Sequence, residues 1–250
     1  MLPLLIKPET YSDHFDLRRE CHLWFLDLTQ LPEDTVRQTQ LFLSTDELQR
    51  MRTLKRRQLE FIATRALVRL CLSRYTNEPP QSLQLKTAEK GKPFLAGANT
   101  PIQFNLSHCN QVAVLVIGWQ AALGVDIEST TRNRSQREIA ARYFHPLELA
   151  QLEKLDNPAH NTHFFRLWTL KEAFFKATGE GISAGLEKAA FHLEGQTINA
   201  QLADELNTQA DDWQFYQTFM NQDFCVALAR HSGEEINIRW FDAAELFLQP

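Results

Sequence analysis

Short apolar runs rich in β-branched and aromatic residues recur along the chain and predict strands. They cover residues 22–28, 83–85, 104–108, 112–117, 121–127, 191–193, 213–219 and 224–229. Gly118-Trp119-Gln120 separates two of these runs and predicts a hairpin or a tight connection between them. The segment after Trp240 carries no clear pattern.

Helical patterns fill the spaces between the strands. Ser44-Thr45-Asp46-Glu47 is a capping box that predicts a helix start. Residues 50–72 combine an inward apolar stripe with many basic residues, and Asn77-Glu78-Pro79-Pro80 ends that pattern. A second helical region follows residues 142–148, and Asp156-Asn157-Pro158 interrupts it before a helix around Trp168 that ends at Gly179.

The helix around Trp168 carries charged residues in an apolar setting. Apolar side chains surround Glu172, Lys171 and Lys176 in this segment. Buried charges are usually paired or bound to a metal, because an isolated charge is costly to bury. The alternative is an ordinary ion pair between Glu172 and Lys176, one turn apart, worth about 0.2–0.5 kcal/mol.

A second acidic cluster lies in the strand Gly124-Val125-Asp126-Ile127-Glu128. Alternate residues of a strand share a face, so Asp126 and Glu128 point one way while Val125 and Ile127 point the other. Two carboxylates about 6–7 Å apart repel each other unless a cation lies between them. Mg²⁺ suits such a pair, and a solvated strand face is the alternative.

The two clusters together resemble the paired signature of the 4′-phosphopantetheinyl transferases. The signature is G-[VI]-D-x-E followed about forty residues later by W-x-x-K-E-A-x-x-K, which stands here at residues 124–128 and 168–176. Gly91-Lys92-Pro93 and then Phe104-Asn105-Leu106-Ser107-His108 precede it in the family's order. The spacing and size resemble the surfactin-type members rather than the small trimeric carrier-protein synthases.

A weak internal repeat accompanies this resemblance. Residues 43–48 match 144–149, Phe61 and Arg65 match Phe164 and Trp168, and residues 107–116 match 219–228. Three matches in the same order indicate a duplication. The resemblance implies an α+β fold of two similar α/β halves in a pseudo-two-fold arrangement, with the active site in the cleft between them. We expect halves at residues 1–121 and 122–250, and a monomer in solution.

The resemblance also implies the reaction. The protein would transfer the 4′-phosphopantetheine arm of coenzyme A to a serine of an apo acyl, peptidyl or polyketide carrier protein and release adenosine 3′,5′-bisphosphate. The implied catalytic residues are Asp126, Glu172 and Lys176, and the implied ligands of Mg²⁺, or of Mn²⁺ as an alternative, are Asp126, Glu128 and Glu172. Glu172 is the expected base, acting directly or through a metal-bound water.

The coenzyme A contacts that the resemblance implies are basic or polar. They are Arg50, Lys86, Lys90, Lys92, Ser107, His108, Lys171 and Lys176. One lysine position of the family, three residues before Arg50, is Glu47 here, so the details of the 3′-phosphate pocket stay open. Glu148 stands where members often carry a glutamate, although a position at a helix start also explains an acidic residue.

Composition narrows the class of protein. The chain has 250 residues with a formal net charge of −5, which argues against general nucleic-acid binding. No apolar run reaches the length of about 20 residues that a membrane span needs, and the first residues lack the features of a signal peptide, so we expect a cytoplasmic protein. Cys21, Cys71, Cys109 and Cys225 form no C-x-x-C pair, so neither zinc nor a disulfide framework is indicated.

Two other functions remain open on the sequence. One is a different Mg²⁺-dependent phosphotransferase with some other nucleotide substrate. Because the chain has neither a G-x-x-x-x-G-K-[ST] nor a G-x-G-x-x-G loop, common ATP-binding designs find no support. The other is an inactive paralogue that only binds coenzyme A or a carrier.

An acidic carrier protein would be steered toward the site by the basic residues of 52–57 or 132–137.

Overall fold

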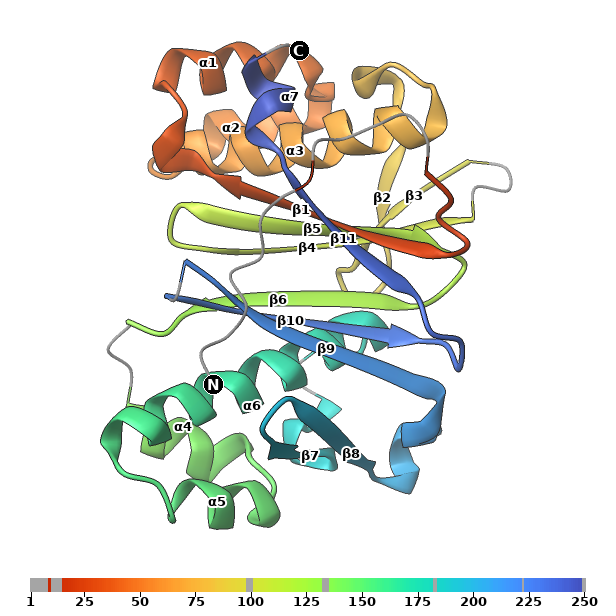
Figure 1. Cartoon of the computed structure of the whole chain (residues 1–250). Helices are drawn as coiled ribbons and strands as arrows, with labels where there is room; N and C mark the ends of the chain where they lie inside the picture. The colour runs from red at the N-terminus through yellow and green to blue at the C-terminus, as the bar shows by residue number, and fades with distance from the viewer. Residues whose placement is uncertain are drawn as a thin grey trace.

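The computed structural model describes residues 9, 15–97, 101–131, 135–181, 184–221 and 223–248. Figure 1 shows four layers, with helices above and below two sheets that lie against each other. The upper sheet has the strand order β11-β1-β5-β4 and the lower sheet has the order β6-β10-β9. Two short hairpins, β2-β3 and β7-β8, lie outside these sheets.

The strands of the described chain are β1 (Glu20–Asp27), β2 (Leu85–Thr87), β3 (Pro93–Leu95), β4 (Ile102–Cys109), β5 (Val112–Trp119), β6 (Leu123–Ser129), β7 (Ala189–Glu194), β8 (Thr197–Leu202), β9 (Trp213–Met220), β10 (Phe224–His231) and β11 (Asn237–Asp242). The helices are α1 (Glu33–Gln38), α2 (Thr45–Thr53), α3 (Gln58–Thr76), α4 (Gln136–Tyr143), α5 (Pro146–Leu152), α6 (Asn157–Thr178) and α7 (Ala244–Leu248). The predicted α+β class is confirmed.

Strand alternation divides the apolar side chains among three cores. In β6, Val125 and Ile127 enter the core between the two sheets together with Val114 and Val116 of β5. Gly124, Asp126 and Glu128 therefore point toward the helical layer on the other side of β6. The remaining cores lie under α3 in the upper half and around α6 in the lower half. The predicted opposition of the acidic and apolar faces of residues 124–128 is confirmed.

The two halves repeat the same order of elements. A strand, three helices, a hairpin and two more strands follow one another as β1, α1, α2, α3, β2-β3, β4 and β5, and again as β6, α4, α5, α6, β7-β8, β9 and β10. Within the sheets, the order β1-β5-β4 matches the order β6-β10-β9. The last strand departs from the repeat, because β11 pairs in parallel with β1 of the upper sheet (Figure 1). The division at residues 121 and 122 stays a prediction.

The structure corrects two local predictions and decides between the alternatives of a third. The helix predicted over residues 50–72 is broken, because α2 ends at Thr53 and α3 begins at Gln58 after Arg57, whose φ of 63° is incompatible with a continuing helix. Of the two alternatives for residues 118–120, the tight connection is confirmed, because only residues 120–122 separate β5 from β6, and the hairpin is excluded, because the two strands belong to different sheets. The strand predicted at 83–85 begins instead at Leu85.

Helix α6 lies directly on β6, and a glycine makes this approach possible. A Cβ atom added to Gly124 would lie 2.0 Å from the carbonyl oxygen of Ala173 and 2.4 Å from the backbone nitrogen of Ala177. Any side chain at this position would therefore push α6 away from the strand. The helix starts at the N-cap Asp156 and ends at Gly179, whose φ of 76° is the predicted C-terminal signal. None of the described helices combines the length and the apolar character of a membrane span.

Candidate active site

Asp126, Ser107 and Lys176 form a hydrogen-bonded group where β4, β6 and α6 meet. One carboxylate oxygen of Asp126, Oδ1, accepts hydrogen bonds from Ser107 Oγ at 2.8 Å and from Lys176 Nζ at 2.6 Å. Lys176 Nζ also donates to Ser107 Oγ at 2.9 Å. Asp126 is 4% exposed and Lys176 is half-buried, so the ion pair lies at the edge of the protein interior.

Strand β4 completes the edge of β6 with side chains instead of backbone. Asn105 Oδ1 accepts from the backbone nitrogen of Val125 at 2.9 Å, and Ser107 Oγ accepts from that of Ile127 at 3.3 Å. These contacts satisfy backbone donors on the edge of β6 that lies away from β10. The hydroxyl of Ser107 therefore joins the two sheets and orients Asp126.

Three of the lysines predicted to contact coenzyme A converge on one pocket. Lys90, Lys92 and Lys176 line a cavity of about 240 Å³ together with Asn105, Leu106 and residues at the end of α6. Lys90 forms an ion pair with Glu180, and both side chains are exposed. Lys92 Nζ donates to the carbonyl oxygens of Leu123 and Ala177 at 2.9 and 2.8 Å, and burial lowers its pKa from 10.5 to about 8.

The assignment of Lys171 to coenzyme A is wrong. Its side chain is fully buried, and Nζ lies 2.7 Å from Glu148 Oε2. Nζ also donates to the carbonyl oxygens of Leu186, at 2.9 Å, and Ala189. Burial lowers the pKa of Lys171 and raises that of Glu148, while their pairing opposes both shifts. Glu148, Leu186 and Ala189 thus accept all three N–H donors of Lys171 in the interior, so none is left for a phosphate in the pocket.

Ser107 and His108 lie on opposite faces of β4, although they are adjacent in the sequence. Ser107 faces β6, whereas His108 Nδ1 lies 2.9 Å from Glu60 Oε1 of α3. Arg57 also binds Glu60, with its Nε donating to Oε2 at 2.6 Å. Burial and the nearby cations lower the pKa of His108, and Glu60 opposes that change. The contact of each residue with coenzyme A stays a prediction.

Arg50 and Lys86 do not line the lysine pocket. Both side chains are exposed, on α2 and β2 respectively. The structure adds Arg65 as a candidate, a half-buried residue of α3 whose Nε is buried without a hydrogen-bond partner among the described residues. Burial lowers the pKa of Arg65, Glu47 opposes that, and Arg50 and Arg69 lower it further. The signal available in the sequence was an arginine within the apolar stripe of α3.

Asp126 offers an oxygen of the kind that Mg²⁺ prefers. Asp126 Oδ2 is buried and has no hydrogen-bond partner within the described ranges, which leaves one hard oxygen for a cation. Glu128 accepts a weak hydrogen bond from Cys109 Sγ at 3.5 Å, and Glu172 lies half-buried on α6 one turn before Lys176. Among the described residues, no three His, Cys, Asp or Glu side chains gather as a metal-binding group, so the three-carboxylate site stays a prediction.

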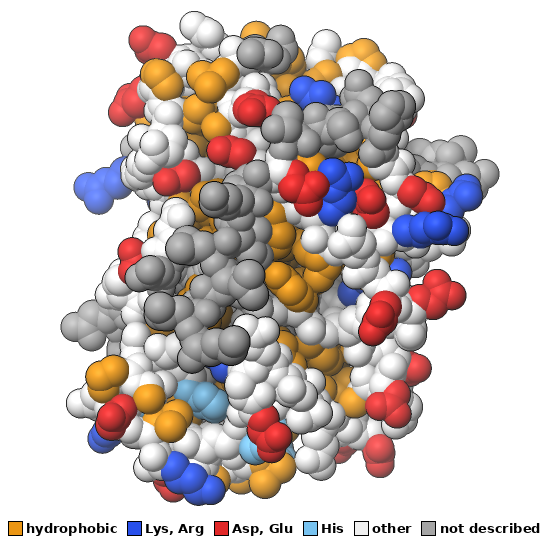
Figure 2. All heavy atoms as spheres, viewed as in Figure 1, with side chains coloured by type: hydrophobic (Ala, Val, Ile, Leu, Met, Phe, Trp, Pro, Cys, Tyr) orange, Lys and Arg blue, Asp and Glu red, His pale blue; other side chains and the backbone are white. Residues whose placement is uncertain are grey.

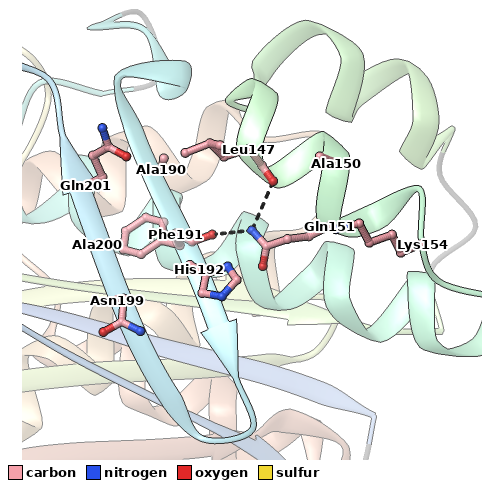
Figure 3. A pocket seen from close by; sticks show the side chains of 10 residues that line it. All are labelled: Leu147, Ala150, Gln151, Lys154, Ala190, Phe191, His192, Asn199, Ala200 and Gln201. Atoms are coloured by element: carbon pink, nitrogen blue, oxygen red, sulfur yellow. Dashed lines mark hydrogen bonds between the residues drawn. The ribbon is translucent and has the colours of Figure 1, made fainter.

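Two further pockets of the described chain contain none of the residues expected to act in catalysis. Figure 3 shows a pocket of about 370 Å³ between α5 and the β7-β8 hairpin, where Gln151 donates to the carbonyl oxygens of Leu147 and Phe191. Another, of about 340 Å³, is lined by Tyr216, Ile236 and Ile238 among others. Figure 2 shows hydrophobic side chains in the band between the two halves on the face in view.

Two family models match the chain. The model of the 4′-phosphopantetheinyl transferase superfamily matches residues 122–229, and the model of the 4′-phosphopantetheinyl transferase N-terminal region matches residues 34–119. Among curated proteins, the chain is 33% identical over 171 residues to 4′-phosphopantetheinyl transferase HetI of Nostoc sp., a match covering 67% of this chain and 72% of that protein. It is 31% identical over 140 residues to 4′-phosphopantetheinyl transferase Sfp of Bacillus subtilis, covering 55% and 60%. The chain belongs to the 4′-phosphopantetheinyl transferase superfamily.

The solved structures that match this protein cover a smaller share of the chain than HetI does. A holo-(acyl-carrier-protein) synthase of Bacillus anthracis, determined in complex with CoA (3′,5′-ADP), matches 45% of this chain and 96% of its own, with 15% identity and a TM-score of 0.37. The corresponding synthase of Neisseria meningitidis matches 44% of this chain and 95% of its own, with 18% identity and the same TM-score.

Proposed function

We propose that the protein transfers the 4′-phosphopantetheine group of coenzyme A to a serine of an apo carrier protein. The observation that supports this most strongly is the pocket lined by Lys90, Lys92 and Lys176, which adjoins the Asp126 carboxylate at the junction of the two halves. A cationic pocket beside a carboxylate matches a reaction that needs a bound pyrophosphate and a proton acceptor close together. Membership of the superfamily supports the same reaction.

The groups in the pocket and near it have separate proposed roles. Lys90 and Lys176 bind phosphate oxygens of coenzyme A, and Ser107 holds Asp126 in position between the sheets. Glu172 takes the proton of the carrier serine, directly or through a water molecule. Arg65, with Arg50 and His108 on the same side of the upper half, contributes to binding the 3′-phosphate. The halves 1–121 and 122–250 would then supply the nucleotide contacts and the carboxylates respectively.

Mg²⁺ is the proposed metal. Asp126, through Oδ2, which has no hydrogen-bond partner among the described residues, would hold it together with Glu128 and Glu172, with Mn²⁺ as a substitute. When bound, the ion neutralises charge on the pyrophosphate. The proposal further includes a cytoplasmic monomer that acts on acyl, peptidyl or polyketide carriers and binds neither nucleic acid nor membranes.

Intact-mass spectrometry tests the proposed reaction. An apo carrier incubated with the protein, coenzyme A and Mg²⁺ should gain the mass of one phosphopantetheine arm, and EDTA or Glu172→Ala should abolish the gain. Lys154→Met, which removes an exposed lysine far from this pocket, serves as the matched control and should retain the activity. If several unrelated carriers gain no mass while the protein still binds coenzyme A, the protein is the inactive paralogue instead.

A further inference from the structure

The turn between β2 and β3 holds Lys92 in a fixed place. Ala88 N donates to the carbonyl oxygen of Lys92 at 2.8 Å, and Gly91 N donates to that of Ala88 at 2.9 Å. Gly91 has a φ of 92°, which a glycine adopts without strain. Pro93 then begins β3. The conformation of Gly91-Lys92-Pro93 is therefore fixed by the turn, and the turn directs the Lys92 side chain toward the second half of the chain.

The ammonium group of Lys92 joins two elements of the other half. One acceptor, the carbonyl oxygen of Leu123, lies at the start of β6, and the other, that of Ala177, lies in the last turn of α6. The last carbonyl groups of a helix lack partners within the helix and carry partial negative charge. The ammonium group of Lys92, from a distant part of the chain, therefore donates a hydrogen bond to a carbonyl group at the C-terminal end of α6.

These contacts lie where α6 and β6 approach each other most closely. Gly124, directly after Leu123, leaves no room for a Cβ against Ala173 and Ala177 of the helix. Lys176, directly before Ala177, reaches Asp126 at 2.6 Å. The clamp by Lys92 is thus one residue away from Lys176 along the helix and three residues from Asp126 along the strand.

We propose that Lys92 is a positioning residue, which caps α6 and thereby holds Lys176 opposite Asp126, instead of a ligand of the coenzyme A phosphates. Two of its three N–H donors are already used inside the protein, and its stem lies near Gly179, where an added Cβ would be 3.7 Å from Lys92 Cδ. The pair of Lys90 and Glu180 is exposed at both ends, so the same turn makes a second but weaker link to the segment after α6. This inference rests on the proposed function for the role of Lys176.

Hydrogen exchange of the protein without ligand separates the two roles. In Lys92→Met, the amides of residues 174–181 should exchange at least about tenfold faster than in the wild type, with the other α6 amides unchanged. Lys92→Arg retains a cation with several donors and should restore most of the protection. Lys154→Met, which removes an exposed lysine far from this turn, is the control and should leave these amides protected. Unchanged exchange in Lys92→Met, with a native circular dichroism spectrum, would overturn the proposal.

Binding and turnover give the second readout. A positioning role predicts that Lys92→Met lowers kcat about tenfold, while its Kd for adenosine 3′,5′-bisphosphate changes by less than about twofold. A phosphate ligand would instead raise that Kd by about tenfold or more. If this Kd rose by that factor and amide hydrogen exchange did not change, Lys92 would be a phosphate ligand after all. The exchange and bisphosphate results do not require transferase activity, so failure of the proposed function would be recognised separately.

Discussion

Lys171 places its ammonium nitrogen 2.7 Å from Glu148 Oε2, and neither side chain is exposed to solvent. The same Oε2 accepts the backbone N–H of His145, the N-cap of α5, at 2.8 Å. In the first half of the chain, Glu47 Oε2 likewise accepts the N-cap N–H of Ser44 at 2.9 Å and binds Arg69 Nε at 2.7 Å.

The cations of these two pairs also make equivalent contacts. Lys171 donates to the carbonyl oxygens of Leu186 and Ala189, just before and at the start of β7. Arg69 donates to those of Pro80 and Leu83, just before β2. Each pair therefore joins a capping-box helix, the long helix that follows it and the base of the next hairpin. This repeated arrangement supports the duplication that the sequence indicates.

Removing one partner of a buried pair leaves the other charge uncompensated. Lys171→Met should lower the free energy of unfolding by about 3–5 kcal/mol, since Glu148 is 0% exposed. Arg69→Met should cost at least about 1 kcal/mol less, because Glu47 is 15% exposed and reaches water more easily. Urea unfolding followed by circular dichroism measures both losses. Equal losses, or a larger one for Arg69→Met, would contradict this account.

Gly124→Ala tests the close approach of α6 to β6. The new methyl group would overlap Ala173 O and Ala177 N, so the helix must shift and Lys176 must move relative to Asp126. We expect a loss of stability of about 2–4 kcal/mol and of most transferase activity. Gly233→Ala is the matched control, since a Cβ there meets nothing within 4 Å. Thermal unfolding and initial rates from mass spectrometry check both variants, and an unchanged Gly124→Ala would exclude the tight packing.

Asp126 and Ser107 should differ strongly in their effects on catalysis. Asp126→Asn removes the charge that pairs with Lys176 and should lower kcat/KM by about a hundredfold or more. Ser107→Ala removes hydrogen bonds to the charged groups of Asp126 and Lys176 but leaves the ion pair between them, so we expect a smaller loss, of about tenfold. Rates of carrier modification measure both. A larger loss for Ser107→Ala than for Asp126→Asn would make the hydroxyl the more important group.

Acid should weaken the fold through His163 of α6. Burial first, and then Arg166, His192 and His160, lower the pKa of His163 from 6.5 to about 4, and its Nε2 is buried without a partner among the described residues. The unfolded chain binds a proton near pH 6.5, whereas the folded one does not. The associated stability is therefore complete above pH 6.5 and is lost as the pH falls to 4. His163→Gln should make the fall of Tm between these values shallower, and an identical slope would contradict the prediction.

The sequence predicted β1, β4, β5, β6, β9 and β10 and the opposed faces of residues 124–128, because these follow from local periodicity. It did not predict β3, β8, α1 or α4. It failed at Lys171, which was assigned by its place in a motif beside Glu172. Consecutive residues of a helix point about 100° apart, so these two side chains lie on different faces. Ser107 and His108 diverge for the corresponding reason in a strand. The pairing of β11 with β1 lay beyond sequence reasoning, because it joins residues more than two hundred positions apart.

The pairing of β11 with β1 joins the C-terminal end of the chain to the sheet of the first half, so the two halves are linked at both ends. If the chain were cut between residues 121 and 122 and the pieces were made separately, the first would lack the neighbour of β1 and the second would carry an orphan strand and α7. The unpaired backbone N–H and C=O groups of an exposed strand edge form hydrogen bonds with strands of other chains. Such fragments would favour reassembly with each other, and each alone would tend to aggregate.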